Sequence, residues 1–395
     1  MLSIKGKMVI GQSGGPTVVI NQSLVGAVLA AREQPGITGI LGARHGIQGI
    51  MDENFVDLTE APDRGQLERV AATPAAALGS VRLKPGEAEC ARVFESFRRH
   101  DVRYFFYIGG NDSAETANII AGMAKDASYD FCTVHIPKTI DNDLKVTDHC
   151  PGFASAARFV ALAFMGDDRD NRALSGIKVN VVMGRHAGFL TAASALARQQ
   201  ADDGPHLIYL PERAFDKARF QQDVREAVAR YGRCVVAVSE GVADADGNPI
   251  ASTGERDSHG NVQLSGTGAL GDRLAGFVHE AFPGEKVRVR ADTFGYLQRS
   301  FPTVVSEVDA REARTVGEVA VRHAVSTGEN GSVAIRRISG TPYESDCFVT
   351  PLSTVAREAT CMDDVYINDA GNDVTGAWLD YLRPLVGELP EMGNL

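Results

Sequence analysis

The chain has 395 residues, of which 44% are hydrophobic and 23% are charged. At about 150 residues per domain this length predicts two or three domains. The composition is close to the average for globular proteins, which excludes a disordered, collagen-like or coiled-coil chain. Lys and Arg number 40 against 51 Asp and Glu, so the formal net charge is -11. This charge repels nucleic acid and anionic lipid, and an anionic ligand must therefore bind at a local site.

Cysteine spacing and hydropathy indicate the compartment. The six cysteines are scattered, without a CxxC pair or a zinc-finger spacing, which is typical of a reducing cytosol. The first ten residues contain Lys5 and Lys7 and do not form a signal peptide. No segment reaches the roughly 20 apolar residues that a membrane-spanning helix needs. We therefore expect a soluble, cytoplasmic protein that binds neither membrane nor nucleic acid.

Apolar runs recur along the chain, each followed by a Gly-rich or polar cluster. This pattern, with amphipathic segments between the runs, predicts an α/β protein with mostly parallel sheets. Helices are expected at 18–31, 114–124 and 187–198. Because ligands of open α/β sheets bind at the carboxyl ends of strands, the clusters form the candidate site. The expected strands and clusters are 8–10 with 12–16, 104–108 with 109–113, 131–136 with 137–143, 177–183 with 184–186, and 234–239 with 240–241.

Two stretches rich in Gly, Asp and Ser interrupt this pattern, at 243–268 and 388–395. The first is long for a connection, and its residues leave open whether it is a lid or a surface insertion. Within it, residues 244–248 lack the glutamate that closes an EF-hand loop, so we expect a turn there.

Ser13, Gly14 and Gly15 precede an expected helix. Backbone N–H groups at a helix N-terminus attract an anion, and glycines let it approach closely. The segment matches neither the P-loop nor the GxGxxG pattern, which argues against a Walker NTPase and a dinucleotide-binding protein. A tight turn that only leads into the helix is an equal alternative.

Three carboxylates follow expected strands. Asp112, with Glu115 three residues later, is explained by helix capping. Asp141 and Asp143 follow an apolar strand and lie close to Lys138 in sequence, and a turn alone needs only one of them. Together they offer a general base, a metal contact through water, and a cation for a phosphoryl group in transfer. The residues themselves therefore favour phosphoryl transfer.

Basic residues at later strand ends suit a phosphorylated substrate. Arg185 follows a strand, where its guanidinium can bind phosphate in a bidentate manner, although a surface salt bridge is the alternative. Arg290, Tyr296 and Arg299 lie on residues 287–299, whose alternation predicts an edge strand, and there plain surface charge is an equal alternative. The nine histidines show no zinc-site spacing.

The order of these motifs resembles the phosphofructokinase family, and within it the pyrophosphate-dependent branch. The likeness extends from about residue 8 to residue 310. It is carried by Gly14-Gly15, Leu78-Gly79-Ser80-Val81-Arg82, Gly109-Gly110-Asn111-Asp112-Ser113, Pro137-Lys138-Thr139-Ile140-Asp141-Asn142-Asp143, Met183-Gly184-Arg185-His186, Ser239-Glu240-Gly241 and Gly295-Tyr296-Leu297-Gln298-Arg299.

The resemblance implies a fold and a division into domains. The fold would be two similar Rossmann-like, three-layer α/β domains with mostly parallel sheets and the active site in the cleft between them. A phosphoryl-donor domain would comprise residues 1–152 and 297–370, and a sugar-phosphate domain residues 153–296. Residues 371–395 would form a C-terminal extension.

By family analogy, Asp141 is the base that takes the proton from the sugar 1-hydroxyl. Arg290 matches an arginine that family members reach across from a neighbouring subunit, which implies a homodimer with shared active sites. The remaining sugar-phosphate contacts implied by the resemblance are Thr139, Ile140, Met183, Gly184, Arg185, Glu240, Tyr296 and Arg299.

The same analogy places the phosphoryl donor. ATP-using relatives carry glycine at the positions of Asp112 and Lys138. A carboxylate at Asp112 would repel the α-phosphate of ATP by roughly 4 kcal/mol at about 4 Å and a dielectric near 20, whereas pyrophosphate ends before that point. Lys138 would place positive charge beside the transferred group. The implied donor contacts are Gly14, Gly15, Arg82, Asn111, Asp112 and Lys138.

Magnesium is the implied cofactor, held mainly by pyrophosphate oxygens, with Asn111, Asp141 and Asp143 as protein contacts. Asn111 departs from the aspartate common in the family and holds the ion more weakly. Gly176 stands where many members have a phosphate-binding arginine, and Lys178 is the candidate replacement.

We therefore expect a reversible enzyme that transfers a phosphoryl group from pyrophosphate to the 1-hydroxyl of fructose 6-phosphate, with Asp141, Lys138 and Asp112 as catalytic residues. The products would be fructose 1,6-bisphosphate and phosphate. Two alternatives stay open, an ATP-dependent 6-phosphofructokinase and a non-catalytic sugar-phosphate sensor. The residues also leave open whether sedoheptulose 7-phosphate is an acceptor and whether an allosteric effector binds.

Overall fold

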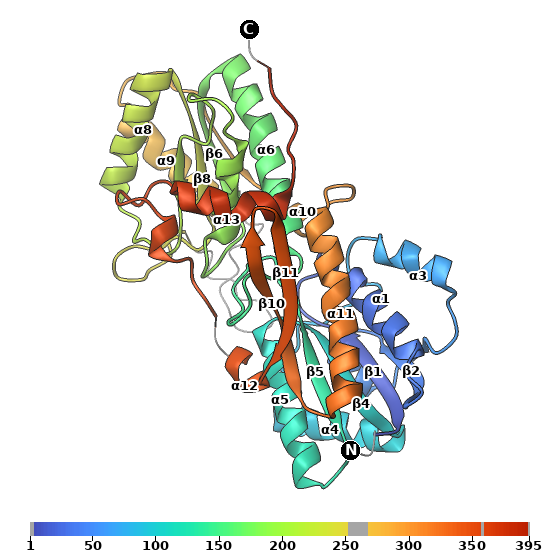
Figure 1. The fold of residues 1–395 in the computed structure, drawn as a ribbon. Coiled ribbons are helices and arrows are strands. Elements are labelled where there is room, and N and C mark those ends of the chain that lie inside the picture. Colours follow the sequence, from blue (N-terminus) through green and yellow to red (C-terminus); the bar gives the residue numbers. More distant parts are fainter. Residues whose placement is uncertain (1–3, 252–267, 357–358, 394–395) are drawn as a thin grey trace. The chain divides into compact units, whose positions relative to one another are not determined.

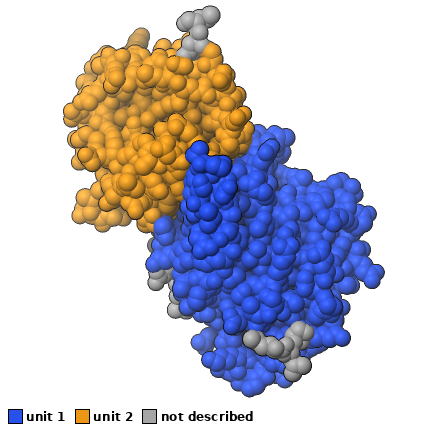
Figure 2. All heavy atoms as spheres, in the orientation of Figure 1, with its two compact units in different colours: residues 1–153, 299–360 blue, residues 154–298, 361–395 orange. Residues whose placement is uncertain are grey.

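The computed structural model describes residues 4–251, 268–356 and 359–393 (Figure 1). The chain forms two compact units, which Figure 2 shows in blue and orange. Unit 1 comprises residues 1–153 and 299–360, and unit 2 comprises residues 154–298 and 361–395. Each unit is a sheet covered by helices, which confirms the predicted α/β layer class. Within the described residues, no helix is both long and apolar enough to cross a membrane.

Unit 1 contains a seven-stranded sheet in the order β11-β10-β5-β4-β1-β2-β3. The edge strands β3 (Phe55–Asp57) and β11 (Tyr343–Thr350) run antiparallel to their neighbours. The central strands are buried on both faces, as their continuous apolar runs predict. The parallel strands are β1 (Gly6–Gln12), β2 (Ile37–Ala43), β4 (Val102–Gly109), β5 (Cys132–Pro137) and β10 (Gly331–Gly340).

Helices cover both faces of this sheet. Met8 and Ile10 of β1 pack with α1 (Ile20–Arg32), α3 (Arg64–Ala71) and α11 (Glu307–Thr327), because alternate side chains of a strand face one side. Val9 packs with helices of the other face. Those helices are α2 (Gly46–Met51), α4 (Glu87–Arg99) and α5 (Asn111–Asp126), while the short α12 (Leu352–Val355) contacts α5.

Two glycines bring α1 and α11 close together. A Cβ on Gly26 would lie 2.3 Å from the carbonyl oxygen of Arg314, and one on Gly317 would lie 2.2 Å from that of Ser23. Neither distance is tolerable for a real side chain. These glycines therefore set the spacing of the helix pair that covers one face of the sheet.

Unit 2 contains a four-stranded parallel sheet in the order β7-β8-β6-β9. One face packs with α8 (Lys217–Tyr231) and α9 (Ala269–Ala281). On the other, Asn180 and Lys178 point to Asp167 of α6 (Phe153–Leu174). The strands are β6 (Gly176–Val182), β7 (Leu207–Tyr209), β8 (Arg233–Ser239) and β9 (Val289–Thr293).

The expected helix at 187–198 is only partly present. It consists of α7 (Phe189–Ala192) and a 3-10 turn, η1 (Ala193–Ala197). The indole Nε1 of Trp378 donates to the carbonyl oxygen of Ala192 at 2.9 Å, where the helix tightens. A distant side chain thus occupies the acceptor that the next α-helical bond would use.

The expected edge strand at 287–299 is also shorter. Only β9 is extended, and it does form an edge of the sheet. Tyr296 lies beyond the strand, and Arg299 lies in the short helix α10 (Leu297–Ser300). The expected turn at 244–248 is confirmed, because Asp244 Oδ1 accepts from the N–H groups of Asp246 and Asn248. Most of the stretch 243–268 lies outside the described residues.

Residues 361–395 belong to unit 2. They contain η2 (Asp364–Tyr366) and α13 (Gly376–Val386). Trp378 of α13 is fully buried, with its ring beside Phe189, Tyr366 and Tyr381. Residues 361–395, of which residues 371–395 were expected to be a C-terminal extension, therefore supply core to unit 2.

A buried charge cluster in unit 1 joins β10 and β11 to α11. His149 is 1% exposed and lies 2.9 Å from Asp148 Oδ2 and 2.6 Å from Glu312 Oε2. Arg337 of β10 pairs with Asp148, and Tyr343 of β11 donates to Glu312. Burial by itself would lower the pKa of His149, but the hydrogen bonds to Asp148 and Glu312 outweigh it and raise the pKa to about 9.

This cluster predicts a pH-dependent stability. The pKa of His149 is higher in the folded chain than the ordinary value of 6.5, so its stabilisation is complete below that value and is lost as the pH rises through about 9. The difference in unfolding free energy between the wild type and His149→Gln is expected to shrink by about 1–3 kcal/mol between roughly pH 7 and pH 10. Denaturant titrations of both proteins measure this difference, and parallel pH profiles would contradict it.

Candidate active site

Three predicted clusters lie at adjacent strand ends in unit 1. The chain passes from β1 to β2 on one side and returns to β4 on the other, so the crevice between β1 and β4 is a topological switch point, where α/β sheets bind ligands. Gly14 follows β1, Asn111 follows β4 and Lys138 follows β5.

Two cations contact the glycine turn after β1. A Cβ on Gly14 would lie 3.1 Å from Lys138 Nζ, and one on Gly15 would lie 2.6 Å from Arg299 Nη1. Gly14 also has a φ of +74°, which favours glycine. The turn thus combines small residues with two positive side chains, as a phosphate site requires. Arg299, which family resemblance predicts at the sugar phosphate, lies in the structure beside the predicted donor turn.

Lys138 is 4% exposed, and its backbone N–H donates to the carbonyl oxygen of Gly109 at 3.0 Å. Burial lowers the pKa of its ammonium to about 8, with Asp141 opposing and Arg299 adding to the shift. Burial and the charge of Asp141 raise the pKa of Asp143 to about 7. Lys138, Asp141, Asp143 and Arg299 therefore form one electrostatically coupled group, in which Lys138 is buried and the other three are half-buried.

The loop after β5 carries the predicted sugar and metal residues. Thr139 and Ile140 follow Lys138 directly, and Thr139 Oγ1 accepts from the N–H of Asp141 at 3.1 Å. The carbonyl oxygen of Asp143 accepts from the N–H of Thr360 at 2.7 Å. The loop is thus held by side-chain and backbone bonds within unit 1.

Asp112 is not the cap of its helix, in contrast to the capping alternative. The helix α5 begins at Asn111 with Gly110 as the cap, so Asp112 lies in its first turn. Its carboxylate Oδ1 lies 3.0 Å from Lys84 Nζ, and the same ammonium lies 3.2 Å from Glu115 Oε2. The N–H of Asp112 donates to Asn111 Oδ1 at 2.9 Å.

This ion pair changes the electrostatic argument about the donor. The repulsion of roughly 4 kcal/mol expected between Asp112 and an inner phosphate assumes an uncompensated carboxylate. Lys84 compensates part of that charge, so the repulsion is smaller than the sequence suggested. Neither composition nor spacing indicated Lys84, because its partners lie 28 and 31 positions later (112 − 84 and 115 − 84).

Unit 2 brings another group of predicted residues together. Ser239 Oγ donates to the carbonyl oxygen of Gly184 in a short hydrogen bond, and the N–H of Glu240 donates to the Val182 carbonyl at 2.9 Å. A Cβ on Gly241 would lie 1.9 Å from the carbonyl oxygen of Arg185. The ends of β6 and β8 are therefore in close contact, and the backbone beside Arg185 packs against the backbone that follows Glu240.

Met183 and Tyr296 belong to the same end of the unit 2 sheet. The N–H of Met183 lies 3.4 Å from Gln298 Oε1, and Gln298 Nε2 donates to the carbonyl oxygen of Gly295 at 2.8 Å. Tyr296 follows this glycine and is 48% exposed. Its side chain thus lies at the surface near the strand ends.

Arg290 is not brought to this end of the sheet. It pairs in register with Lys178 of β6, five residues before Met183. At about 3.3 Å per strand residue, roughly 16 Å separate the two positions along the sheet. Arg290 therefore does not join the other predicted sugar residues of its own unit.

The suggested role of Lys178 is not supported. Its Nζ lies 2.8 Å from Asp167 and 2.7 Å from Asp292, so two carboxylates compensate its charge. Gly176 has a φ of +113°, and a Cβ there would lie 2.5 Å from the carbonyl oxygen of Arg288. The backbone at this position therefore requires glycine and excludes an arginine.

Glu212 holds the loop that follows Arg185, although nothing in the sequence distinguished it. Its Oε1 accepts from the N–H of Gly188 at 2.8 Å and from that of Met362 at 2.9 Å. Burial raises the pKa of its carboxyl group, with the two hydrogen bonds opposing. One acceptor thus joins the 186–188 loop to the C-terminal segment of unit 2.

Replacing Glu212 by leucine is expected to raise KM for the sugar phosphate about tenfold, because two buried N–H groups lose their acceptor at a cost of about 1–3 kcal/mol. Glu212→Gln keeps an acceptor oxygen and is expected to stay near the wild-type value. Steady-state kinetics with the sugar phosphate varied distinguish the two. Equal KM values for the leucine and glutamine variants would contradict this role.

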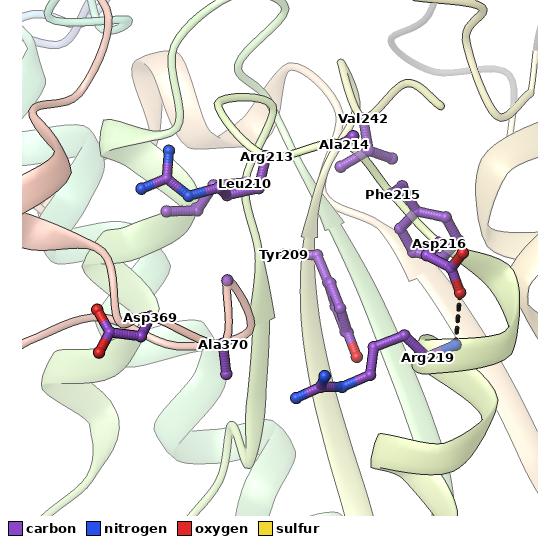
Figure 3. A pocket seen from close by; sticks show the side chains of 11 residues that line it. Tyr209, Leu210, Arg213, Ala214, Phe215, Asp216, Arg219, Val242, Asp369 and Ala370 are labelled. Carbon is purple, nitrogen blue, oxygen red and sulfur yellow. Dashed lines mark hydrogen bonds between the residues drawn. The ribbon is translucent and has the colours of Figure 1, made fainter. Parts of the chain in front are cut away.

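Unit 2 also contains a cavity of about 160 Å³ between the end of β7, the start of α8 and residues 369–371 (Figure 3). Tyr209 and Phe215 supply its aromatic side. Its two arginines are compensated, Arg213 by Asp364 at 2.8 Å and Arg219 by Asp223 at 3.0 Å. None of the predicted site residues, all of which the structure describes, lines it. The cavity is therefore separate from the candidate site.

The chain belongs to the phosphofructokinase family, because the family model described as Phosphofructokinase matches residues 7–324. A relative named pyrophosphate--fructose 6-phosphate 1-phosphotransferase from Rhodospirillum rubrum is 56% identical over 387 residues, which are 97% of this chain and 95% of the relative. The protein of that name from Xanthomonas campestris pv. campestris is 40% identical, and the matched residues are 98% of this chain and 93% of that protein. A crystal structure of pyrophosphate-dependent phosphofructokinase from Marinobacter aquaeolei matches with a TM-score of 0.85 at 33% identity, covering 98% of this chain and 94% of that one. The predicted family is confirmed.

Proposed function

We propose that this chain is an enzyme that transfers a phosphoryl group from pyrophosphate to the 1-hydroxyl of fructose 6-phosphate, giving fructose 1,6-bisphosphate and phosphate. The observation that carries the proposal is the buried ammonium of Lys138 against the Gly14 turn, together with the carboxylate of Asp112 in the first turn of α5. The names of the relatives support the same donor and acceptor. The Gly14 turn, Asp112 and Lys138 would bind the donor, and residues 139–141 would hold the reacting end of the sugar phosphate.

In the proposed reaction, the sugar 1-hydroxyl oxygen attacks the terminal phosphorus of pyrophosphate. The bond from that phosphorus to the bridging oxygen breaks, phosphate leaves, and the hydroxyl proton passes to the carboxylate of Asp141. Lys138 and Arg299 hold positive charge beside the transferred group, where burial strengthens the interaction. The phosphoanhydride of pyrophosphate and the phosphoester of the product differ little enough in free energy for the reaction to run in reverse.

Magnesium is part of this proposal. The candidate ligands Asn111, Asp141 and Asp143 are oxygen donors, as Mg²⁺ prefers. Burial and, after it, the charge of Asp141 raise the pKa of Asp143, and a bound cation would relieve the repulsion between these two carboxylates. Within the described residues, no group of three or more His, Cys, Asp or Glu side chains is arranged to hold a metal. This suits an ion bound by one or two carboxylates together with substrate phosphates. When bound, the ion would neutralise charge on the diphosphate.

Arg290 enters the proposal through a second copy of the chain. Because Arg290 lies roughly 16 Å along the sheet from Met183, we assign it to the sugar site of a partner subunit in a homodimer. The proposed location is the cytoplasm, where the six free cysteines would remain reduced.

A coupled assay for fructose 1,6-bisphosphate tests the proposal with the purified protein, fructose 6-phosphate and magnesium. Turnover is expected with pyrophosphate and not with ATP. Faster turnover with ATP would identify an ATP-dependent kinase instead. Sugar-phosphate binding without turnover from either donor would identify a sensor.

A further inference from the structure

Lys84 connects the segment that carries Arg82 to the first turn of α5. Its Nζ lies 3.0 Å from Asp112 Oδ1 and 3.2 Å from Glu115 Oε2. Residues three apart on a helix share a face, so one ammonium reaches both carboxylates. The hydrogen bond to Asp112, followed by that to Glu115, raises the pKa of Lys84. The side chain therefore stays cationic at neutral pH.

The exposure of the Lys84, Asp112 and Glu115 side chains indicates how much their ion pairs can contribute to the stability of unit 1. The Lys84 and Asp112 side chains are 53% and 59% exposed, whereas that of Glu115 is only 9% exposed. Exposed ion pairs contribute on the order of 0–1 kcal/mol to stability. The ion pair with Asp112 therefore contributes little to the stability of unit 1, and its main effect falls on the charge and position of Asp112 and the Arg82 segment.

The segment before Lys84 is already bonded to the glycine turn. Ser80 Oγ donates to the carbonyl oxygen of Gly14 at 2.6 Å, and the N–H of Gly14 donates to the Val81 carbonyl at 3.2 Å. Arg82 lies between these bonds and the Lys84 ion pairs. The guanidinium is thus carried on a short segment that is anchored on both sides, upstream to the turn after β1 and downstream to α5.

We propose that Lys84 is a positioning residue for the phosphoryl donor. It compensates the charge of Asp112 and Glu115 and holds the Arg82 segment against α5, so that a diphosphate can bind next to a carboxylate that obstructs a larger nucleotide. This inference rests on the proposed function. Without the ammonium, Asp112 and Glu115 lose a cation that offsets their charge next to an anionic donor, and the Arg82 segment loses its downstream anchor.

Lys84→Met is expected to raise KM for pyrophosphate about tenfold at low salt and less at high salt, since exposed charges are screened. The values of kcat and of KM for fructose 6-phosphate are expected to stay within about twofold, because Lys84 acts on the donor alone. Lys84→Arg keeps the charge and is expected to restore donor binding. Lys125→Met, at the exposed far end of the same helix, serves as the matched control.

A cycle with Asp112→Asn tests whether Lys84 acts through Asp112. In that background, Lys84→Met is expected to raise KM for pyrophosphate by a smaller factor than in the wild type. The inference is overturned by an unchanged KM for pyrophosphate in Lys84→Met, by an equal rise in KM for the sugar phosphate, or by an equal effect in both backgrounds. Titration calorimetry with pyrophosphate gives the same comparison without turnover. Failure of the proposed function is separate, since the wild type itself would then show no pyrophosphate turnover.

Discussion

Asp141→Asn is expected to lower kcat in both directions by a factor of about 10²–10⁴, the usual contribution of a general base. Asparagine preserves the shape of the side chain but cannot take the proton of the attacking hydroxyl. The KM values are expected to change little, because Lys138 and Arg299 still hold the donor charge. Initial rates with pyrophosphate and fructose 6-phosphate, and with phosphate and fructose 1,6-bisphosphate, measure the effect.

The matched control for this variant is Asp126→Asn, at the exposed end of α5 and outside the candidate site. It is expected to retain wild-type kinetics. A kcat for Asp141→Asn within about tenfold of the wild type would remove Asp141 from the role of base, and Asp143, the other carboxylate of the group, would become the candidate.

The double variant Asp112→Gly, Lys138→Gly is expected to change the donor preference. Replacing Lys138 removes the positive charge that lies beside the transferred phosphoryl group. Such a loss typically lowers kcat by a factor of about 10²–10³. Loss of the Asp112 carboxylate removes an obstruction to the inner phosphates of a nucleotide. The ratio of kcat/KM for ATP to that for pyrophosphate is therefore expected to rise by more than about a thousandfold.

The single variants separate the two contributions. Lys138→Gly alone is expected to lose pyrophosphate turnover without gaining ATP turnover, whereas Asp112→Gly alone is expected to keep much of the former. Wild-type pyrophosphate activity in the double variant would contradict both assigned roles. Lys84 already compensates part of the Asp112 charge. The expected gain in ATP turnover therefore comes from the space that the missing side chain leaves as well as from the loss of electrostatic repulsion.

The strand ends of the site could be predicted because their signals are local. A buried parallel strand reads as an apolar run, and a cluster such as Pro137 to Asp143 follows it directly in the chain. The switch-point rule then places the clusters after β1 and β4 on the same edge. The resemblance to a family added roles that no local signal carries, such as that of Asp141 as a base.

Side-chain partners could not be predicted in this way. Lys84 and Asp112 meet because residues 80–81 are bonded to the turn after β1, next to β4, and Arg299 reaches Gly15 from a segment far along the chain. A lysine that compensates a site carboxylate looks the same in sequence as any surface lysine. Glu212 was missed for the same reason, since the groups that donate to its carboxylate are the backbone N–H groups of Gly188 and Met362, which lie far apart in the sequence.

For this protein the amino-acid sequence determined the α/β class, the order of the strands along the chain and the residue types at their ends, since these depend on hydrophobic periodicity and turn chemistry over a few neighbouring residues. The tertiary structure decided the order of the strands within each sheet, which charges are buried or compensated, and that residues 361–395 supply core to unit 2. Those features depend on contacts between segments far apart in the chain, and the cost of burying a charge is set by whatever packing brings beside it.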